Sequence, residues 1–371
     1  MTQAATFLFA GGGSGGHLYP GIAIADELRR RDTNSRIVFV GSERPMEADI
    51  LQSTGYRHYP LPVESLRELR RWPPRFLWRN WRAWRKAQQI VSSERPQAVI
   101  GLGGFASAPA VWAAARQGIP ITLIEQNAVP GAATRWLARS AQQIFLTFEE
   151  AKRHLPATAN TLVTGNPVRA ELQSISRPQS GEQADDRQSV LILGGSQGAE
   201  SLNNAVMQVW ASGALELNRW RVIHQTGKGR AESIRDQYRE FKMDAQVEEF
   251  FPNMAEQYAM ADLVISRAGA TTLAELLCVG CPSVLVPYPF AADQHQAANA
   301  AVLEQCGAAV MVRQTDDAKE TAQRLIHAIQ PLWCDRTRRA AMSAAARTLA
   351  RPDAAQRAAD VILNQAEQRV A

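Results

Sequence analysis

Two glycine-rich segments, one in each half of the chain, have the composition of ligand-binding loops. The first reads GGGSGGH at residues 11–17 and the second reads GGSQG at residues 194–198, and each follows an apolar run. Glycines after a buried strand allow a tight turn in which backbone N–H groups approach phosphate, and the N-terminus of the following helix favours an anion. The Ser196 hydroxyl, with Gln197 beside it, adds a phosphate donor. These loops therefore predict a ligand that carries phosphate.

The sequence around these loops argues against three common phosphate-binding chemistries. Gly11, Gly13 and Gly16 have dinucleotide-fingerprint spacing, but the acidic residue expected about 20 residues later is missing, Glu43 being the nearest candidate. Neither loop continues into Lys-Ser or Lys-Thr, and the chain has no Asp-x-Asp pair to hold a metal-bound diphosphate. What remains is a site without metal or other cofactor for a sugar nucleotide, its diphosphate stabilised by helix dipoles and arginine.

His17 and Glu125 are the candidates for a catalytic base. His17 follows the first glycine loop at the start of an expected helix, where the positive end of the helix dipole favours a neutral imidazole. A neutral imidazole suits general-base catalysis, while a purely structural histidine is the alternative. Glu125 lies beside Asn127 at the end of an expected strand and competes for the same role.

Short apolar runs alternate with helical segments along both halves of the chain. In the first half we expect strands at residues 7–10, 36–40, 98–101, 119–124 and 143–148, with helices at residues 18–31, 79–92 and 108–117. In the second half we expect strands at residues 190–193, 221–225, 247–251, 263–266, 283–286 and 308–312. Because several runs lack polar alternation, they predict parallel sheets that are buried on both faces.

The expected fold class is therefore α/β, with two Rossmann-like, doubly wound parallel-sheet domains facing across a cleft. A chain of 371 residues exceeds one ordinary core, and we place the domains at residues 1–165 and 166–350. Residues 351–371 form a C-terminal helix that can pack back on the first domain. Ligands of such sheets bind at the carboxyl ends of the strands, so both glycine loops would line the cleft.

The amino-terminal sequence and the cysteines bear on the cellular compartment and on metal binding. No basic stretch precedes the first apolar run, which does not support a secretory signal and predicts a cytoplasmic protein. Cys278 and Cys281 have metal-like spacing, but Cys306 and Cys334 form no matching pair and no histidine is close. We therefore expect four buried, apolar thiols and no metal site.

The first glycine loop belongs to a longer segment, GGGSGGHLYP at residues 11–20, that resembles the amino-terminal signature of the MurG family. This family comprises the N-acetylglucosaminyl transferases of peptidoglycan synthesis. Further blocks resemble the family in the same order, at residues 101–105, 125–127, 165–169, 194–198, 266–275 and 293–300. Ser14 stands where many members have threonine, and Phe105 where tyrosine is common.

The resemblance implies a GT-B fold in which UDP-N-acetylglucosamine binds the second domain and a lipid-linked muramoyl-pentapeptide approaches the first. It places Arg169 against the diphosphate, although an interdomain ion pair is the alternative. Glu275 lies about one turn inside an expected helix, where its carboxylate can accept hydrogen bonds from ribose hydroxyls. A surface carboxylate without a ligand role is the alternative. The expected substrate-binding residues are Ser14, Gly15, Gly16, Asn127, Arg169, Ser196, Gln197, Phe251, Ala270, Thr271, Thr272, Leu273, Ala274, Glu275 and Gln296.

A basic, aromatic segment at residues 66–86 suits an anionic membrane surface. If residues 76–91 form a helix, Leu77, Trp81, Trp84 and Val91 share one face, and tryptophan favours the headgroup boundary. Packing of the tryptophans into the core is the main alternative, and nucleic acid is not expected because no nucleic-acid module accompanies the segment. The expected membrane residues are Trp72, Arg75, Trp78, Arg79, Trp81 and Arg82.

These observations predict an inverting glycosyltransferase that works as a peripheral protein on the cytoplasmic face of the inner membrane. The acceptor's muramoyl 4-hydroxyl would attack the anomeric carbon, while glycine-loop N–H groups and Arg169 stabilise the departing UDP. A UDP-sugar epimerase of the same fold and a non-catalytic sugar-nucleotide-binding membrane protein are the alternatives.

Overall fold

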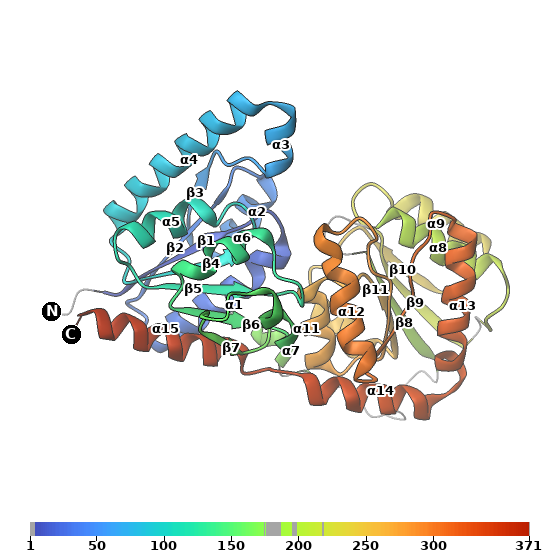
Figure 1. The fold of residues 1–371 in the computed structure, drawn as a ribbon. Coiled ribbons are helices and arrows are strands. Elements are labelled where there is room, and N and C mark those ends of the chain that lie inside the picture. Colours follow the sequence, from blue (N-terminus) through green and yellow to red (C-terminus); the bar gives the residue numbers. More distant parts are fainter. Residues whose placement is uncertain (1–3, 174, 176–186, 195–198, 217–218, 371) are drawn as a thin grey trace. The chain divides into compact units, whose positions relative to one another are not determined.

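The computed structural model describes residues 4–173, 175, 187–194, 199–216 and 219–370 of the 371-residue chain. The chain divides into two compact units (Figure 1). Unit 1 comprises Met1–Arg169 and Pro352–Ala371, and unit 2 comprises Ala170–Arg351. The boundary expected at residue 165 lies slightly upstream of the observed division.

Unit 1 contains a parallel sheet in the order β3-β2-β1-β4-β5-β6-β7. Its strands are β1 (Thr6–Gly11), β2 (Arg36–Ser42), β3 (Arg57–Leu61), β4 (Ala98–Gly103), β5 (Ile121–Glu125), β6 (Gln143–Leu146) and β7 (Thr161–Val163). Its helices are α1 (Gly15–Arg31), α2 (Pro45–Thr54), α3 (Leu66–Arg71), α4 (Pro73–Glu94), α5 (Ala108–Arg116), α6 (Ala132–Leu137) and α15 (Ala354–Val370), with 3-10 turns η1 (Ala138–Ser140) and η2 (Glu149–His154).

Successive residues of β1 point into two separate cores, as expected for a strand buried on both faces. Phe7 and Phe9 pack with residues of α1 and α15, whereas Leu8 and Ala10 pack with residues of α4 and α5. Helix α15 is therefore an integral part of unit 1. Two side-chain contacts accompany this packing, an ion pair from Arg31 to Asp360 and a hydrogen bond of 2.8 Å from Thr122 Oγ1 to Gln365.

Unit 2 contains a second parallel sheet in the order β10-β9-β8-β11-β12-β13. Its strands are β8 (Gln188–Leu193), β9 (Trp220–Gln225), β10 (Ala245–Glu248), β11 (Leu263–Ser266), β12 (Ser283–Leu285) and β13 (Ala309–Met311). Its helices are α7 (Ala170–Gln173), α8 (Glu200–Ala211), α9 (Ala231–Glu240), α10 (Met254–Met260), α11 (Ala270–Val279), α12 (His295–Gln305), α13 (Ala318–Cys334) and α14 (Arg336–Leu349), with the 3-10 turn η3 (Ala292–Gln294).

A buried polar cluster lies within the core of unit 2. His224 is fully buried on β9, and its Nδ1 and Nε2 atoms lie 2.9 Å from the Tyr238 hydroxyl and 3.1 Å from Asn203 Oδ1. Burial lowers the pKa of His224 to about 3, because the charged imidazolium would lose its hydration. The histidine is therefore neutral in the folded protein near pH 7.

The two parallel sheets confirm the expected fold class, and the differences from the expected elements are local. Strands β3 and β7 were not expected because β3 is a polar edge strand and β7 is very short. Strand β10 ends at Glu248 rather than at residue 251. The expectation of four buried thiols is wrong, since Cys306 and Cys334 are exposed.

Candidate active site

His17 lies where the loops after β1 and β4 meet. Ser14 occupies the N-cap position of α1, yet its side chain makes no cap hydrogen bond, and its Oγ lies 3.0 Å from His17 Nδ1. The imidazole packs against two glycines with positive φ, Gly103 at +90° and Gly104 at +71°, and a Cβ added to Gly103 would lie 3.1 Å from the ring. These glycines leave space for the ring, and Ser14 orients it.

The loop after β5 borders the same place. Glu125 is only 2% exposed, and its carboxylate accepts hydrogen bonds from the Asn127 N–H at 3.0 Å, the Asn127 side chain at 3.2 Å and the Gly131 N–H at 3.1 Å. Gln126 donates to the Leu102 carbonyl at 2.9 Å, and its Oε1 lies 3.5 Å from the position of a Gly103 Cβ. Gln126 therefore flanks Gly103 beside His17, and sequence reasoning overlooked it within its own Glu-Gln-Asn block.

Arg169 lies next to helix α1, where it contacts an aromatic ring. Its guanidinium lies 5.4 Å from the centre of the Tyr19 ring, which is close enough for a cation–π interaction. Tyr19 also explains Gly15, because a Cβ at Gly15 would come within 3.1 Å of the tyrosine ring, whereas Gly16 is exposed. Arg169, Tyr19 and the first glycine loop therefore form one cluster in unit 1.

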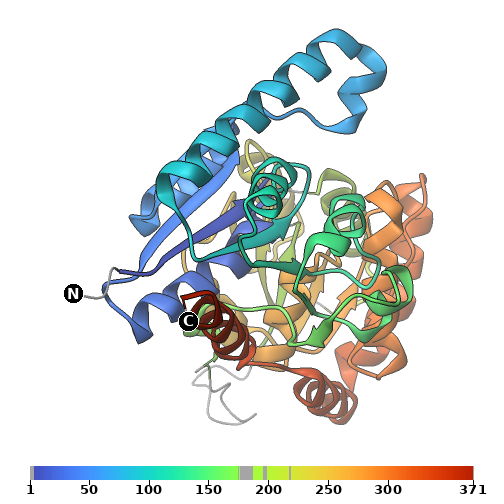
Figure 2. The ribbon, with the colours of Figure 1, turned by 60° about the vertical axis from the view of Figure 1, so that its left-hand side comes forward.

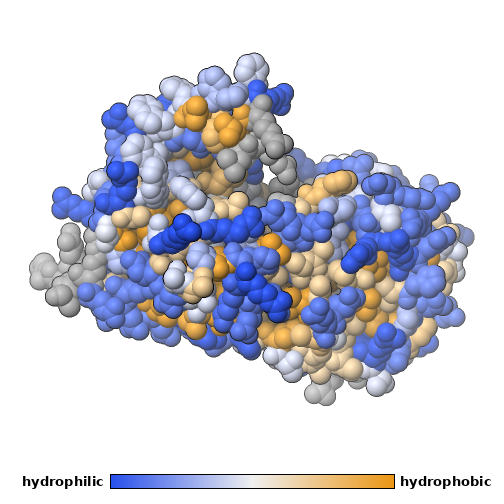
Figure 3. All heavy atoms as spheres, viewed as in Figure 1, coloured by the Kyte–Doolittle hydropathy of each residue, from blue (hydrophilic) through white to orange (hydrophobic). Residues whose placement is uncertain are grey.

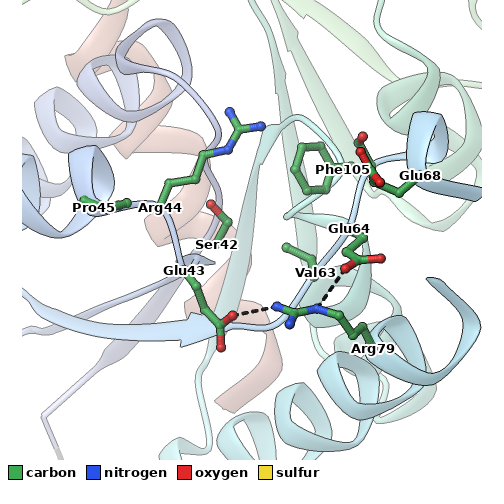
Figure 4. Close-up of a pocket in the computed structure, with 10 residues that line it drawn as sticks. Ser42, Glu43, Arg44, Pro45, Val63, Glu64, Glu68, Arg79 and Phe105 are labelled. Atoms are coloured by element: carbon green, nitrogen blue, oxygen red, sulfur yellow. Dashed lines mark hydrogen bonds and ion pairs between the residues drawn. The ribbon is translucent and has the colours of Figure 1, made fainter. Parts of the chain in front are cut away.

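A pocket of about 330 Å³ lies in unit 1 beside the first glycine loop (Figure 4). Arg44 binds the Gly13 carbonyl at 2.6 Å and lies 5.6 Å from the Phe105 ring centre. Arg79 spans the pocket wall, with ion pairs to Glu43 at 2.7 Å and Glu64 at 3.1 Å. The lining residues are Ser42, Glu43, Arg44, Pro45, Val63, Glu64, Ser65, Glu68, Arg79 and Phe105.

In unit 2, the first two turns of α11 carry the candidate donor residues. Glu275 is 8% exposed, and its Oε2 accepts a hydrogen bond of 2.9 Å from the Tyr258 hydroxyl. Thr271 and Thr272 are half-buried, whereas Leu273 is fully buried and faces the interior. Ala270 and Ala274 are 8% and 7% exposed. The helix therefore offers its N-terminus, two hydroxyls and one oriented carboxylate, but Leu273 is unsuited to frame a base.

Arg267 is a buried cation at the end of β11 that was not among the expected site residues. It is 7% exposed, and it donates to the Val286 carbonyl at 3.0 Å and to the Ser201 hydroxyl at 2.8 Å. Its guanidinium lies 5.7 Å from the Tyr288 ring centre, and burial lowers its pKa to about 10. A buried guanidinium held by neutral acceptors near a helix N-terminus suits an anionic ligand.

The neighbouring rings of Phe250 and Phe251 differ in exposure, and the expected site residue Phe251 is the buried one. Phe251 is 2% exposed, whereas Phe250 is 55% exposed, so Phe250 presents the ring at this surface. Gln296, at the start of α12, accepts a hydrogen bond of 2.9 Å from the Tyr288 N–H. Ser196 and Gln197 lie outside the described residues.

Helix α4 and its N-cap residue Trp72 present three of their four tryptophans to solvent. Trp72, Trp78 and Trp81 are 59%, 54% and 50% exposed, and α3 with the first half of α4 extends away from the sheet of unit 1 (Figure 2). The predicted apolar face is only partly correct, because Leu77 is exposed but Val91 is buried with Ala83 and Ala87. The buried residues of α4 are Ala83, Ala87, Ile90, Val91 and Glu94, whereas the exposed Trp78 and Trp81 precede them along the helix.

Arginine and further tryptophans extend this exposed surface. Arg82 and Arg85 lie over the rings of Trp78 and Trp81, at 4.6 and 5.2 Å. Apolar side chains are visible over α3 and α4 in Figure 3. A row of rings continues from half-buried Trp84 to Trp112 on α5 and Trp136 on α6, with centres 5.6 and 6.2 Å apart. Among the described residues, no helix is long and apolar enough to span a membrane.

Comparisons with known proteins cover both units. Residues 7–146 match the glycosyltransferase family 28 N-terminal domain, and residues 189–358 match the corresponding C-terminal domain. A Geobacter sulfurreducens protein is 39% identical over 359 residues, which cover 95% of this chain and 96% of that protein. It is named UDP-N-acetylglucosamine–N-acetylmuramyl-(pentapeptide) pyrophosphoryl-undecaprenol N-acetylglucosamine transferase.

Solved structures give the same fold. Acinetobacter baumannii MurG superposes with a TM-score of 0.75 at 29% identity, covering 97% of this chain and 99% of that one. The UDP-GlcNAc 2-epimerase of Neisseria meningitidis superposes with a TM-score of 0.69 at 15% identity, covering 97% of this chain and all of its own. The epimerase shares the fold alone, so the fold does not distinguish glycosyl transfer from epimerisation.

Proposed function

The chain belongs to the MurG family of glycosyltransferases, and we propose that it moves N-acetylglucosamine from UDP-N-acetylglucosamine to the muramoyl 4-hydroxyl of the lipid-linked muramoyl-pentapeptide. Its two Rossmann-like units are those of the GT-B fold. The observation that carries this function is 39% identity over 95% of the chain to a relative named for this transfer. The epimerase alternative has only 15% identity in its favour.

His17 is the general base of this proposal. The acceptor's O4 attacks the anomeric carbon, its proton passes to an imidazole nitrogen, and the bond from that carbon to the diphosphate breaks with its electron pair on UDP. Attack from the opposite face inverts the configuration and gives a β linkage. Ser14 on Nδ1 supports this role, because a hydrogen bond at one ring nitrogen fixes the tautomer at the other.

Glu125 is better suited to hold the loop than to take the proton. Both carboxylate oxygens already accept hydrogen bonds from Asn127 and Gly131, and the side chain is almost fully buried. A base must lie within hydrogen-bond distance of the hydroxyl that it deprotonates. Glu125 would therefore orient Asn127, which we propose as a contact for a sugar.

The leaving diphosphate requires cations and N–H donors that are already in place. Arg267 and the N-terminus of α11, with Thr271 and Thr272, provide these in unit 2. Arg169 is a second cation at the His17 cluster, and Ser196 and Gln197 of the second glycine loop remain proposed phosphate donors. Fixed donors directed at developing negative charge lower the barrier because they need no reorganisation during the reaction.

Donor specificity is assigned to residues of unit 2. The Glu275 carboxylate would accept hydrogen bonds from the ribose hydroxyls, and the Tyr258 hydroxyl holds it in orientation. The exposed ring of Phe250, in place of buried Phe251, would cover the uracil. Gln296 would contact the N-acetylglucosamine.

The acceptor's lipid tail remains in the bilayer, so a surface of unit 1 must reach the cytoplasmic face of the membrane. We assign this role to Trp72, Leu77, Trp78 and Trp81, with Trp112 and Trp136 at the side. Tryptophan and arginine together favour the anionic headgroup region. Arg75 and Arg79 are removed from this set because both pair with Glu64, and Arg79 also pairs with Glu43. Arg82 and Arg85 are exposed.

One assay separates the possible functions. The protein is incubated with UDP-N-acetylglucosamine alone and with the lipid-linked acceptor, and both nucleotide sugar and lipid products are measured. Transfer predicts UDP release and a lipid-linked disaccharide only with acceptor. A 2-epimerised sugar without acceptor would indicate an epimerase, and no turnover under either condition would indicate a binding protein.

A further inference from the structure

Glu47, in the first turn of α2, is a fully buried carboxylate directly against the first glycine loop. It is 0% exposed, and its two oxygens accept hydrogen bonds from the Gly13 N–H at 2.6 Å, from the Ser42 N–H at 2.8 Å and from the Ser42 hydroxyl. These three donors fix the position of the carboxylate. Glu47 therefore joins the ends of β1 and β2 at one point.

The glycines around Glu47 are required by space. A Cβ at Gly12 would lie 2.2 Å from Glu47 Oε2, and a Cβ at Gly41 would lie 2.3 Å from the same oxygen. Neither glycine has a positive φ, so the backbone conformation itself does not require glycine there. The carboxylate and the loop are complementary in shape, and any larger residue at Gly12 would displace one of them.

The hydrogen bond at Gly13 also changes the expected chemistry of the loop. A glycine-rich loop binds phosphate by directing its N–H groups at the ligand, but the Gly13 N–H is directed at Glu47 instead. The next residue, Ser14, contacts His17. The Gly13 N–H therefore holds the loop itself rather than a phosphate of the ligand.

We propose that Glu47 is a positioning residue that sets the location of His17 through Gly13 and Ser14. This inference rests on the proposed function, in which His17 accepts the proton of the acceptor hydroxyl. Glu47 itself does not touch the substrate. Displacing a catalytic group by about 1 Å can cost about 100-fold in rate, so the loss of Glu47 should appear in kcat rather than in donor affinity.

The test is a double-mutant cycle between Glu47→Gln and His17→Ala. Glutamine preserves the shape but presents an N–H₂ group to N–H donors, which breaks at least one hydrogen bond. We expect Glu47→Gln alone to lower kcat about 10- to 100-fold, with UDP affinity unchanged within twofold. In the His17→Ala background the same substitution should cause no further loss, because its effect passes through His17.

Asp49→Asn is the matched control, because Asp49 is an exposed acid on the same helix and should leave kcat unchanged. Gly12→Ala is a second perturbation that retains the carboxylate and should give the same kinetic pattern. If Glu47→Gln does not fold, Ser42→Ala removes one donor and is measured in the same cycle. Full activity of folded Glu47→Gln, or an equal loss with and without His17, would overturn the proposal. Absence of transfer by the wild-type protein would instead refute the proposed function.

Discussion

Replacement of Glu275 by alanine should weaken UDP binding by unit 2. The carboxylate is 8% exposed and oriented by the Tyr258 hydroxyl at 2.9 Å, so it can accept ribose hydroxyls without reorganisation. Loss of hydrogen bonds to a charged group costs about 1–3 kcal/mol. This corresponds to an increase of about 5- to 150-fold in the dissociation constant, measured by calorimetry with UDP.

The substitution also leaves Tyr258 without this acceptor, and a second measurement separates the two effects. Tyr258→Phe removes the tyrosine hydroxyl while retaining the carboxylate, and it should weaken UDP binding less than Glu275→Ala. The wild-type protein should bind 2′-deoxy-UDP more weakly than UDP, whereas Glu275→Ala should distinguish the two ligands poorly. Equal UDP affinity of Glu275→Ala and wild type would remove Glu275 from the donor site and refute this reasoning.

His17→Ala should lower kcat by about 10²–10⁴-fold while UDP affinity is unchanged, measured by initial rates and calorimetry. Charge reversal at Arg82 and Arg85 should reduce sedimentation with anionic vesicles, since each basic residue near such a surface contributes about 1 kcal/mol, and transfer to a short-chain acceptor should be retained. Below pH 6.5 the unfolded chain binds a proton at His224, whereas the folded protein does not until about pH 3. The free energy of unfolding, measured by urea titration, should therefore fall by up to about 1.4 kcal/mol per pH unit as pH decreases from 6.5, with no contribution from this group above that pH.

Matched controls decide each of these results. Glu125→Gln is measured beside His17→Ala, and a larger loss at Glu125 would reassign the base. Arg336→Glu with Arg338→Glu makes the same charge change on exposed residues of unit 2, and an equal loss of vesicle binding would mean that net charge alone is responsible. For the pH dependence, His224→Gln should flatten the slope and exposed His327→Gln should not, so equal slopes would exclude His224 as the source.

The fold was accessible from the sequence because its strands are short apolar runs that end in glycine loops. Such runs identify strands buried on both faces, and residues 7–10 and 263–266 are examples. Strand β3 was not predicted, because an edge strand buries little of its surface and its RHYPL sequence lacks an apolar run. Burial, rather than intrinsic propensity, made the other strands recognisable.

The site was predictable only where a motif is local in sequence. His17 and Ser14 lie within one loop, whereas Glu47 and Gly13 are 34 residues apart and meet only after β1 and β2 pair. The choice between Phe250 and Phe251 depends on how the chain turns after β10, which periodicity does not reveal.

The extent of burial along α4 was not predictable for a similar reason. Its buried residues, Ala83, Ala87, Ile90, Val91 and Glu94, all lie from Ala83 onward, so Leu77 and Trp81 stay exposed although they share a helical face with Val91. Helical periodicity correctly leaves Trp78 and Trp81 exposed, but it shows neither where along α4 burial begins nor that Arg79 pairs with Glu43 and Glu64.

The most direct test of the central claim is the structure of the product formed from UDP-N-acetylglucosamine and the lipid-linked muramoyl-pentapeptide. Nuclear magnetic resonance of the isolated disaccharide gives both the linkage position and the anomeric configuration. We expect a β-linked N-acetylglucosamine on the muramoyl 4-hydroxyl, formed by the wild-type protein and strongly reduced with His17→Ala. A retained α configuration, another linkage position or the absence of any lipid-linked disaccharide would contradict it.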